Sequence, residues 1–190
     1  MRRLLLTLTV IIFFYGCSYV PTTYPSPVNL PQSTAVDELG AMLAEKNFNS
    51  EELRKVQDRI LELKKGLDRE KVKKYSKLFI KYSEKYDLDV NLVLHISYLE
   101  SRFEEDVVSR TGDYGLMQIN WKAHHRLLQK MGIDRGMLLD PEINLDYACK
   151  LLRLISQDSK SLDGIVRKYA PRHPRVYAQK LRRLMSESKI

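Results

Sequence analysis

The sequence of 190 residues predicts an all-α fold, and three observations support this prediction. Apolar residues recur at intervals of three and four in most segments from residue 36 onward. These segments are bounded by Gly, Pro, Asp or Ser, and no apolar–polar alternation is long enough for a useful strand. With 44% hydrophobic and 29% charged residues, the chain suits one globular bundle of about seven or eight helices with appendages.

The first 16 residues have the pattern of a secretory signal peptide. Two arginines precede an apolar run over residues 4–15, which ends at Gly16-Cys17. The run of about 12 residues is shorter than the roughly 20 that span a bilayer, so an uncleaved membrane anchor is less favoured. Gly16-Cys17 resembles a bacterial lipoprotein cleavage site, which predicts a lipid on Cys17. The mature protein is then expected at the periplasmic face of the outer membrane; an ordinary signal peptide with an incidental cysteine is the alternative.

Two further segments precede the expected compact domain. Residues 17–35 contain four prolines among Ser, Thr and Asn, which is typical of a flexible tether. Residues 36–69 are predicted to form a helical N-terminal segment, because residues 50–68 carry one apolar stripe on an otherwise charged helix. The stripe lasts only about two heptads, which favours a packing helix against the main domain over a coiled coil.

The compact domain is predicted to span residues 70–190. Its helices are expected at residues 71–87, 89–103, 120–132, 141–158, 161–170 and 174–188. Cys149 lies in an apolar helical pattern, and the other cysteine is the predicted lipidation site. We therefore expect Cys149 to be a small buried residue and the fold to be held by packing, without a disulfide.

The net charge of +8 leaves the protein basic. Nucleic acid is not an expected partner, because the chain has no zinc-finger spacing, no glycine-rich phosphate loop and no RNA-binding signature. An exported basic protein instead meets anionic lipid and cell-wall polymer. The basic stretch at residues 165–186 is either a solvated helix face or a surface for such anions. The four histidines have no metal-ligand spacing, so neither a metal nor a cofactor is expected.

Glu100 follows a helical segment that is apolar on nearly every face. It shares a helix face with Val93 and Ile96, so its carboxyl is expected in core-like surroundings. Loss of solvation raises the pKa of such a carboxyl and lets it hold a proton near neutral pH, as a general acid requires. In the alternative interpretation, Glu100 caps the helix end or pairs with Arg102 or Arg110.

The residues that follow Glu100 carry a specific combination of motifs. The chain has Glu100-Ser101, then Gly-Leu-Met-Gln-Ile-Asn at residues 115–120, then Asp-Pro at residues 140–141 with Asn144 beyond it. In this order they resemble the lytic transglycosylases of the goose-type lysozyme superfamily, over roughly residues 75–185. The resemblance implies a lysozyme-like helical domain and cleavage of the β-1,4 bond between N-acetylmuramic acid and N-acetylglucosamine in peptidoglycan glycan strands.

The resemblance also implies roles for individual residues. Glu100 is the expected catalytic acid, and the expected substrate-binding residues are Ser101, Ser109, Tyr114, Met117, Gln118, Ile119, Asn120 and Tyr169. Ser109 is expected to contact a sugar acetamido group. Ala170 follows Tyr169 where the family has asparagine. The Met-Gln-Ile-Asn sequence is most similar to members linked to secretion machines, which makes an envelope-spanning secretion or motility apparatus a possible partner.

Two alternatives to this function stay open. A hydrolase of the same substrate needs a second carboxylate, for which Glu104, Glu105, Asp106 and Asp113 are the candidates. The family's goose-type lysozymes often have an aspartate where this chain has Asn120, and an amide cannot activate water, which favours transglycosylation. A non-catalytic wall-binding lipoprotein is the other alternative, because of Ala170.

Overall fold

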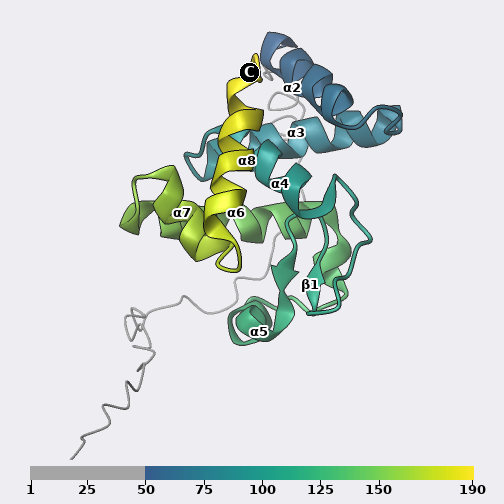
Figure 1. Ribbon diagram of the computed structural model, residues 1–190. Coiled ribbons are helices and arrows are strands. Elements are labelled where there is room, and N and C mark those ends of the chain that lie inside the picture. Colours follow the sequence, from purple (N-terminus) through teal and green to yellow (C-terminus); the bar gives the residue numbers. More distant parts are fainter. Residues whose placement is uncertain (1–49) are drawn as a thin grey trace, which may run out of the picture. The chain divides into compact units, whose positions relative to one another are not determined.

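The computed structural model describes residues 50–190 (Figure 1). Within this range the chain forms seven α-helices, one short 3-10 helix and two two-residue strands. The helices are α2 (Ser50–Leu63), α3 (Arg69–Lys85), α4 (Val90–Ser101), α5 (Trp121–Lys130), η1 (Met137–Leu139), α6 (Pro141–Asp158), α7 (Leu162–Tyr169) and α8 (Pro174–Ser186). The predicted all-α class is confirmed. The predicted signal peptide, Cys17, the tether and residues 36–49 lie outside the described residues.

Polar side chains at the helix starts explain why the helices begin where they do. The side-chain oxygen at the N-cap accepts hydrogen bonds from backbone N–H groups that have no partner inside the helix. The N-caps that do this are Asp68 for α3, Asp89 for α4, Asn120 for α5, Asp140 for α6 and Ser161 for α7. Pro141 then occupies the first turn of α6, where the absence of an N–H costs nothing.

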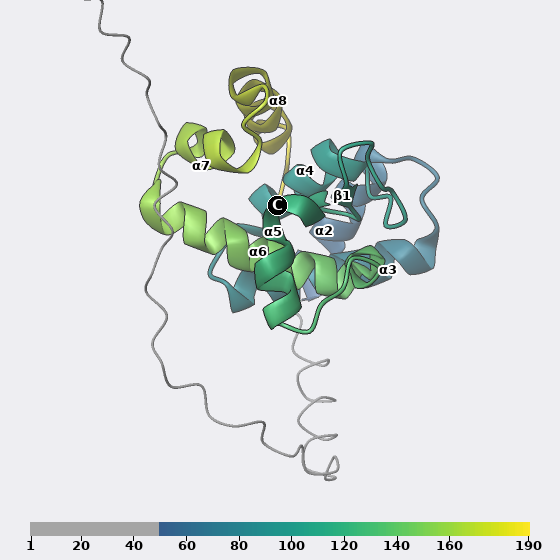
Figure 2. The same ribbon diagram turned by 90° about the horizontal axis from the view of Figure 1, so that it is seen from below.

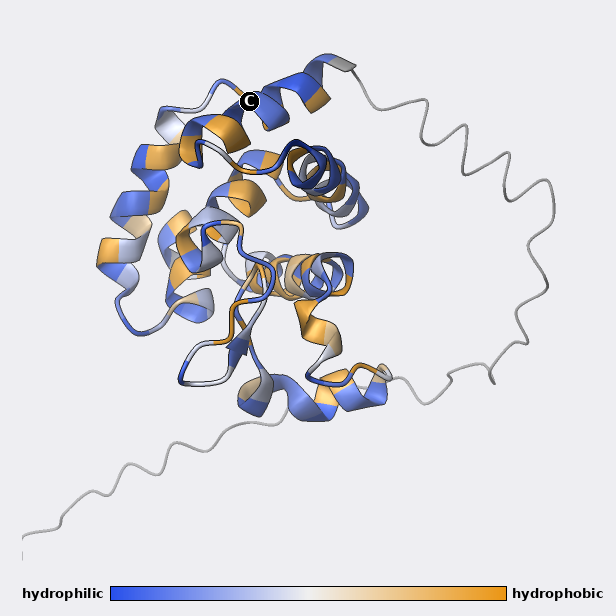
Figure 3. Ribbon diagram, turned by 90° about the vertical axis from the view of Figure 1, so that its right-hand side faces the viewer, coloured by the Kyte–Doolittle hydropathy of each residue, from blue (hydrophilic) through white to orange (hydrophobic). Residues whose placement is uncertain are grey.

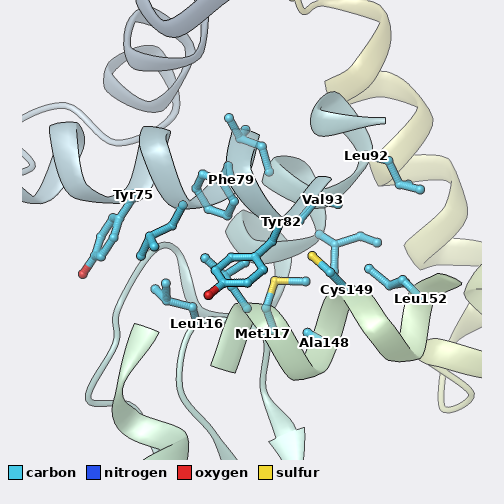
Figure 4. Packing of buried hydrophobic residues seen from close by; sticks show 14 of the residues in the cluster. Tyr75, Phe79, Tyr82, Leu92, Val93, Leu116, Met117, Ala148, Cys149 and Leu152 are labelled. Carbon is cyan, nitrogen blue, oxygen red and sulfur yellow. The ribbon is translucent and has the colours of Figure 1, made fainter. Parts of the chain in front are cut away.

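The core lies between α3, α4 and α6. Figure 4 shows Phe79 and Tyr82 of α3 in the same apolar cluster as Ala148 and Cys149 of α6, with Met117 beside them. Cys149 is buried and unpaired, as predicted. Figure 3 shows blue and orange alternating along the helices, so most of them bury one side only. Helix α4 is the exception, because every residue from 92 to 97 is buried.

Helix α4 ends two residues earlier than its apolar pattern predicts. Arg102 and Phe103 both adopt positive φ, 55° and 60°, and the Arg102 N–H donates to the carbonyl of Tyr98. The predicted helix to residue 103 is therefore wrong at its end. Phe103 is nevertheless fully buried, because the turn directs its ring against Phe79 at a centroid distance of 5.9 Å. This turn begins the loop that connects α4 to α5 and contains the Gly-Leu-Met-Gln residues.

Helices α7 and α8 pack against each other, and α8 also packs against α4 (Figures 1 and 2). Helix α2 packs on α3. None of the helices within residues 50–190 is long and apolar enough to cross a membrane.

Candidate active site

Glu100 is the second-last residue of α4. Residues 92–97 of the same helix are buried, whereas Glu100 itself is partly buried and lines a groove. Its carboxylate oxygen Oε1 accepts a hydrogen bond of 2.8 Å from the hydroxyl of Tyr177 on α8. No ion pair joins Glu100 to Arg102 or Arg110 among the described side chains. The acid is therefore held by a neutral donor and not by a cation.

The surroundings of Glu100 favour its protonated form. Burial raises the pKa of the carboxyl to about 7, and the negative charge of Asp113 acts in the same direction. The Tyr177 hydrogen bond opposes these effects, because it stabilises the ionised form. Near neutral pH a large fraction of the molecules thus carries a proton on Glu100, and the ionised form is equally accessible. A carboxyl with this pKa can donate a proton and later take one back.

The glycine-rich loop beside Glu100 contains a short hairpin. Strand β1 (Asp113–Tyr114) pairs antiparallel with β2 (Ile119–Asn120), a feature that the sequence did not predict. Gly115 opens the connection with a φ of 71°. A Cβ on Gly115 would lie 2.4 Å from the backbone oxygen of Leu138, so no residue with a side chain fits there.

Asn144 of α6 holds this loop in place through hydrogen bonds. Its side chain is fully buried, and its amide nitrogen donates to the carbonyls of Tyr114 and Leu138, each at 2.8 Å. Its Oδ1 accepts from the backbone N–H of Met117, also at 2.8 Å. One side chain therefore satisfies three buried backbone groups and determines how the loop lies against α6. The role of Asn144 explains why an amide follows the Asp-Pro start of α6.

Tyr169 of α7 also holds the loop by a hydrogen bond. Its hydroxyl donates a hydrogen bond of 2.9 Å to the carbonyl of Met117. Burial raises the pKa of Tyr169 well above its ordinary value, and the nearby charge of Glu100 adds to this, so the hydroxyl keeps its proton. Ser97 of α4 makes a weaker bond of 3.3 Å to the Leu116 carbonyl. The loop is thus hydrogen-bonded to α4, α6 and α7.

A groove of about 530 Å³ runs past these elements. This volume lies within the range of ligand-binding clefts. The residues that line it are Glu100, Asp113, Gln118, Ile119, Asn120, Ala123, His124, Leu151, Ile155, Lys168, Tyr169, Ala170, Pro171, Arg172, His173 and Tyr177. The groove is therefore lined by the acid, the hairpin, residues of α5 and α6, and the α7–α8 connection.

Asp113 is a second carboxylate in the same groove, in different surroundings. Burial alone would raise its pKa, but hydrogen bonds from Ser109, Thr111 and Asn120 outweigh burial and lower the pKa, as does the charge of Arg172. The hydroxyl of Ser109 and the amide of Asn120 lie 2.6 Å from its oxygens. Asp113 is consequently ionised at neutral pH, with most of its acceptor sites occupied.

The other candidate second carboxylates do not line the groove. Glu104 pairs with Lys64, and Glu105 pairs with Lys71 at 2.8 Å. These pairs tie the start of the loop to α2–α3 and α3, respectively. Asp106 is exposed and absent from the groove lining. Among the four acids considered, Asp113 alone lines the groove with Glu100.

Comparison with known proteins agrees with this arrangement. Residues 77–170 match the family model described as "Transglycosylase SLT domain". The chain carries an SLT domain. This match runs from α3 to the end of α7 and contains Glu100, the hairpin and Tyr169, but neither α2 nor Tyr177.

Several curated proteins are similar to part of this chain. The chain is 36% identical over 87 residues to membrane-bound lytic murein transglycosylase C of Pectobacterium atrosepticum, covering 43% of this chain and 24% of that protein. It is 32% identical over 88 residues to membrane-bound lytic murein transglycosylase F of Pseudomonas putida, covering 46% and 17%. It is 36% identical over 77 residues to Protein IpgF of Shigella flexneri, covering 38% and 50%. The chain thus spans half or less of the length of these relatives, and no solved structure gives a significant match.

The structure brings only some of the predicted binding residues to the groove of the SLT domain. Gln118, Ile119, Asn120 and Tyr169 line it together with Glu100. Four others do not: Ser101, Ser109, Tyr114 and Met117. Ser101 is buried and donates to the Ser97 carbonyl at 3.2 Å, and Ser109 bonds Asp113. Tyr114 and Met117 present backbone carbonyls to Asn144 and Tyr169. The roles of all eight as substrate contacts stay predictions.

Sequence reasoning missed Tyr177, although this residue makes the direct hydrogen bond to Glu100. The two residues are 77 positions apart, and no local pattern connects them. A signal was nevertheless present, because Tyr177 lies one turn before the buried Leu181 and adjoins the buried Ala178. A tyrosine on the inner side of a basic, amphipathic helix predicts a hydroxyl that forms a hydrogen bond with a buried group.

Histidines do not make a metal centre in this SLT domain. His124 lines the groove and exchanges a 2.9 Å hydrogen bond with the Tyr147 hydroxyl, and burial lowers its pKa. His95 is fully buried in α4. Within residues 50–190 no group of three or more His, Cys, Asp or Glu is arranged to hold a metal ion.

Proposed function

We propose that the protein is a peptidoglycan lytic transglycosylase in which Glu100 is both the acid and the base. A single observation carries the proposal: a carboxyl with a pKa raised to about 7 lines a groove of about 530 Å³ beside the Gly-Leu-Met-Gln loop of an SLT domain. The names of two similar proteins support the same substrate. The reaction cleaves the β-1,4 bond between N-acetylmuramic acid and N-acetylglucosamine.

In the first step protonated Glu100 gives its proton to the glycosidic oxygen. The bond between this oxygen and the anomeric carbon of the muramic residue breaks, and the N-acetylglucosamine end leaves with a free hydroxyl. In the second step the Glu100 carboxylate takes the proton of the muramic 6-hydroxyl while its oxygen bonds to the anomeric carbon. The product has a 1,6-anhydro end, Glu100 is protonated again, and no water is consumed.

One carboxyl is sufficient for this chemistry because the nucleophile belongs to the substrate. The 6-hydroxyl is already held near the anomeric carbon, so no second residue has to position water. Tyr177 supports Glu100 in both steps, since its hydroxyl donates to the carboxylate and keeps the ionised form accessible between them. The burial of Tyr177 raises the pKa of its hydroxyl, which keeps it a donor.

A second candidate function is hydrolysis of the same bond, and the position of Asp113 favours it. A glutamate with a raised pKa and an ionised, hydrogen-bonded aspartate in one groove are the pair of carboxyls that a retaining glycosidase uses as acid and nucleophile. Asp113 already accepts bonds from Ser109, Thr111 and Asn120, which leaves it little capacity to act on the sugar or on water. For this reason we favour transglycosylation.

The products separate the two reactions. Purified sacculi digested with the protein are analysed by mass spectrometry. Transglycosylation gives muropeptides with 1,6-anhydro ends, which are lighter than the hydrolytic products by one water and lack a reducing end. Ordinary reducing muropeptides as the main product would reject the proposal in favour of hydrolysis.

A binding experiment tests the alternative of a wall-binding protein without activity. The Glu100→Gln variant is expected to bind sacculi as well as the wild type while releasing no fragments. An Arg183→Gln variant is a matched surface control, because Arg183 is exposed and pairs with Glu187 away from the groove. Equal release by wild type and Glu100→Gln would show that Glu100 does not carry the reaction.

We also propose that the protein acts in the periplasm from a lipid anchor on Cys17. The signal-peptide pattern and the membrane-bound names of two relatives support this location. Labelling of growing cells with a radioactive fatty acid should mark the wild type and not a Cys17→Ser variant, which should also leave the membrane fraction. A secretion or motility apparatus stays a predicted partner.

A further inference from the structure

Arg59 of α2 is a buried arginine that the proposed reaction does not use. Its side chain is only 8% exposed, yet its guanidinium donates three hydrogen bonds. They go to Nε2 of His95 at 3.0 Å, to Glu62 at 2.9 Å and to the backbone carbonyl of Leu184 at 2.7 Å. Removing a guanidinium from water is costly unless its donors are satisfied, so these partners determine where Arg59 can lie.

The first partner, His95, is part of the helix that carries Glu100. Because Arg59 donates to Nε2, this nitrogen must be the acceptor, and Nδ1 must carry the proton that it shares with the Asn91 carbonyl at 2.7 Å. Burial lowers the pKa of His95 to about 4, which keeps the ring neutral in this tautomer at physiological pH. Arg59 is therefore hydrogen-bonded to α4 at His95, five residues before Glu100.

The second partner, the Leu184 carbonyl, belongs to α8. It lies seven residues after Tyr177, or about 10 Å along the helix. Helices α4 and α8 are thus joined at two levels. Arg59 connects them at the level of His95 and Leu184, and the hydrogen bond from Tyr177 connects them at Glu100. The first connection limits how far α8 can slide or tilt against α4.

We propose that Arg59 is a positioning residue, which holds α8 against α4 so that the Tyr177 hydroxyl reaches Glu100. This inference rests on the proposed role of Glu100. It also extends the functional unit beyond the family match, because α2 lies before residue 77 and α8 lies after residue 170. Helix α2, residues 50–63, then contributes to the arrangement of the active site and does not only pack on α3.

An Arg59→Met variant of the full chain tests the proposal. Turnover of sacculi is measured between pH 5 and 9. We expect kcat to fall a few fold at pH 7 with KM nearly unchanged, because the substrate contacts stay while the Tyr177 hydroxyl no longer reaches Glu100. We also expect the alkaline limb of kcat to move to higher pH. Besides burial, Tyr177 and Asp113 act on the pKa of Glu100, whereas Tyr169 is a neighbour whose own pKa the Glu100 charge raises; loss of the Tyr177 bond raises the pKa of Glu100.

Two comparisons separate positioning from general stability. Ile60→Val loosens the neighbouring, fully buried residue of α2 and leaves the Arg59 hydrogen bonds intact. It should lower the melting temperature without moving the pH profile. His95→Gln keeps an acceptor for Arg59 and His95→Leu does not, so the glutamine variant should lie closer to wild type. This pair decides the question even where Arg59→Met fails to fold.

A readout without catalysis distinguishes this proposal from the proposed function. The pKa of Glu100 is followed by ¹³C NMR of its carboxyl in wild type and in Arg59→Met. An upward shift supports positioning by Arg59 whatever reaction the groove performs. An unchanged pKa, together with a kcat and pH profile like those of the wild type, overturns it.

Discussion

Two carboxyls line the same groove in opposite surroundings. Glu100 stands at the end of a buried helix with one neutral donor, and burial raises its pKa to about 7. Asp113 stands in a polar hairpin with three side-chain donors, and these hydrogen bonds lower its pKa in spite of burial. The comparison teaches that residue type does not assign the role of a carboxyl. Its supply of hydrogen-bond donors decides whether it keeps or loses its proton at neutral pH.

The largest expected effect comes from removing the proton of Glu100. Glu100→Gln keeps the size of the side chain and the acceptor for Tyr177, but it has no acid. We expect a fall in turnover of about 10³-fold, as for the loss of a general acid. Release of soluble muropeptides from sacculi measures it. A residual rate within tenfold of the wild type would contradict the role of Glu100 as the general acid.

The same substitution is expected to stabilise the fold in alkaline solution. The folded-state pKa of about 7 lies above the ordinary 4.5, so the folded protein binds this proton more tightly than the unfolded chain. The associated stability is full below pH 4.5 and is lost as the pH rises to 7. At pH 8, Glu100→Gln should exceed the wild type by about 3 kcal/mol in unfolding free energy, and at pH 4 the two should be equal. Urea unfolding at both pH values checks this.

Replacing the second carboxylate is expected to have a smaller effect. Asp113→Asn removes the negative charge that raises the Glu100 pKa and disturbs the bonds from Ser109 and Asn120. We expect a loss of about tenfold in turnover, with products that still carry 1,6-anhydro ends. Mass spectrometry and rate are read together. A loss as large as that of Glu100→Gln would instead make Asp113 an equal partner, as in hydrolysis.

The smallest expected effect comes from the donor to Glu100. Tyr177→Phe removes one hydroxyl and preserves the ring, so the packing of α8 should stay intact. Since the hydroxyl lowers the pKa of Glu100, its removal should raise that pKa and move the alkaline limb of kcat to higher pH. We expect a loss of a few fold at pH 7. Tyr169→Phe is the control, because that hydroxyl bonds the Met117 carbonyl and not Glu100.

Much of the fold was readable from the sequence because its signals are local. Asp89 and Asp140 start helices by bonding N–H groups two residues on, and the apolar run of α4 predicts burial by its composition alone. The core-like setting of Glu100 followed from the same run. The end of that helix did not, since the left-handed turn at Arg102 is stabilised by Phe103 packing against residues of two helices.

The sequence by itself determined which segments are helical, where the acid stands, and which glycine-rich loop follows it. Only the tertiary structure decided what surrounds that acid. The Tyr177 hydroxyl reaches Glu100 across 77 residues, and Arg59 reaches the Leu184 carbonyl across 125. Helix formation depends on neighbours within about one turn, whereas these contacts depend on how whole helices pack. The chemistry of the carboxyl is set by that packing, because solvation and hydrogen bonds determine its pKa.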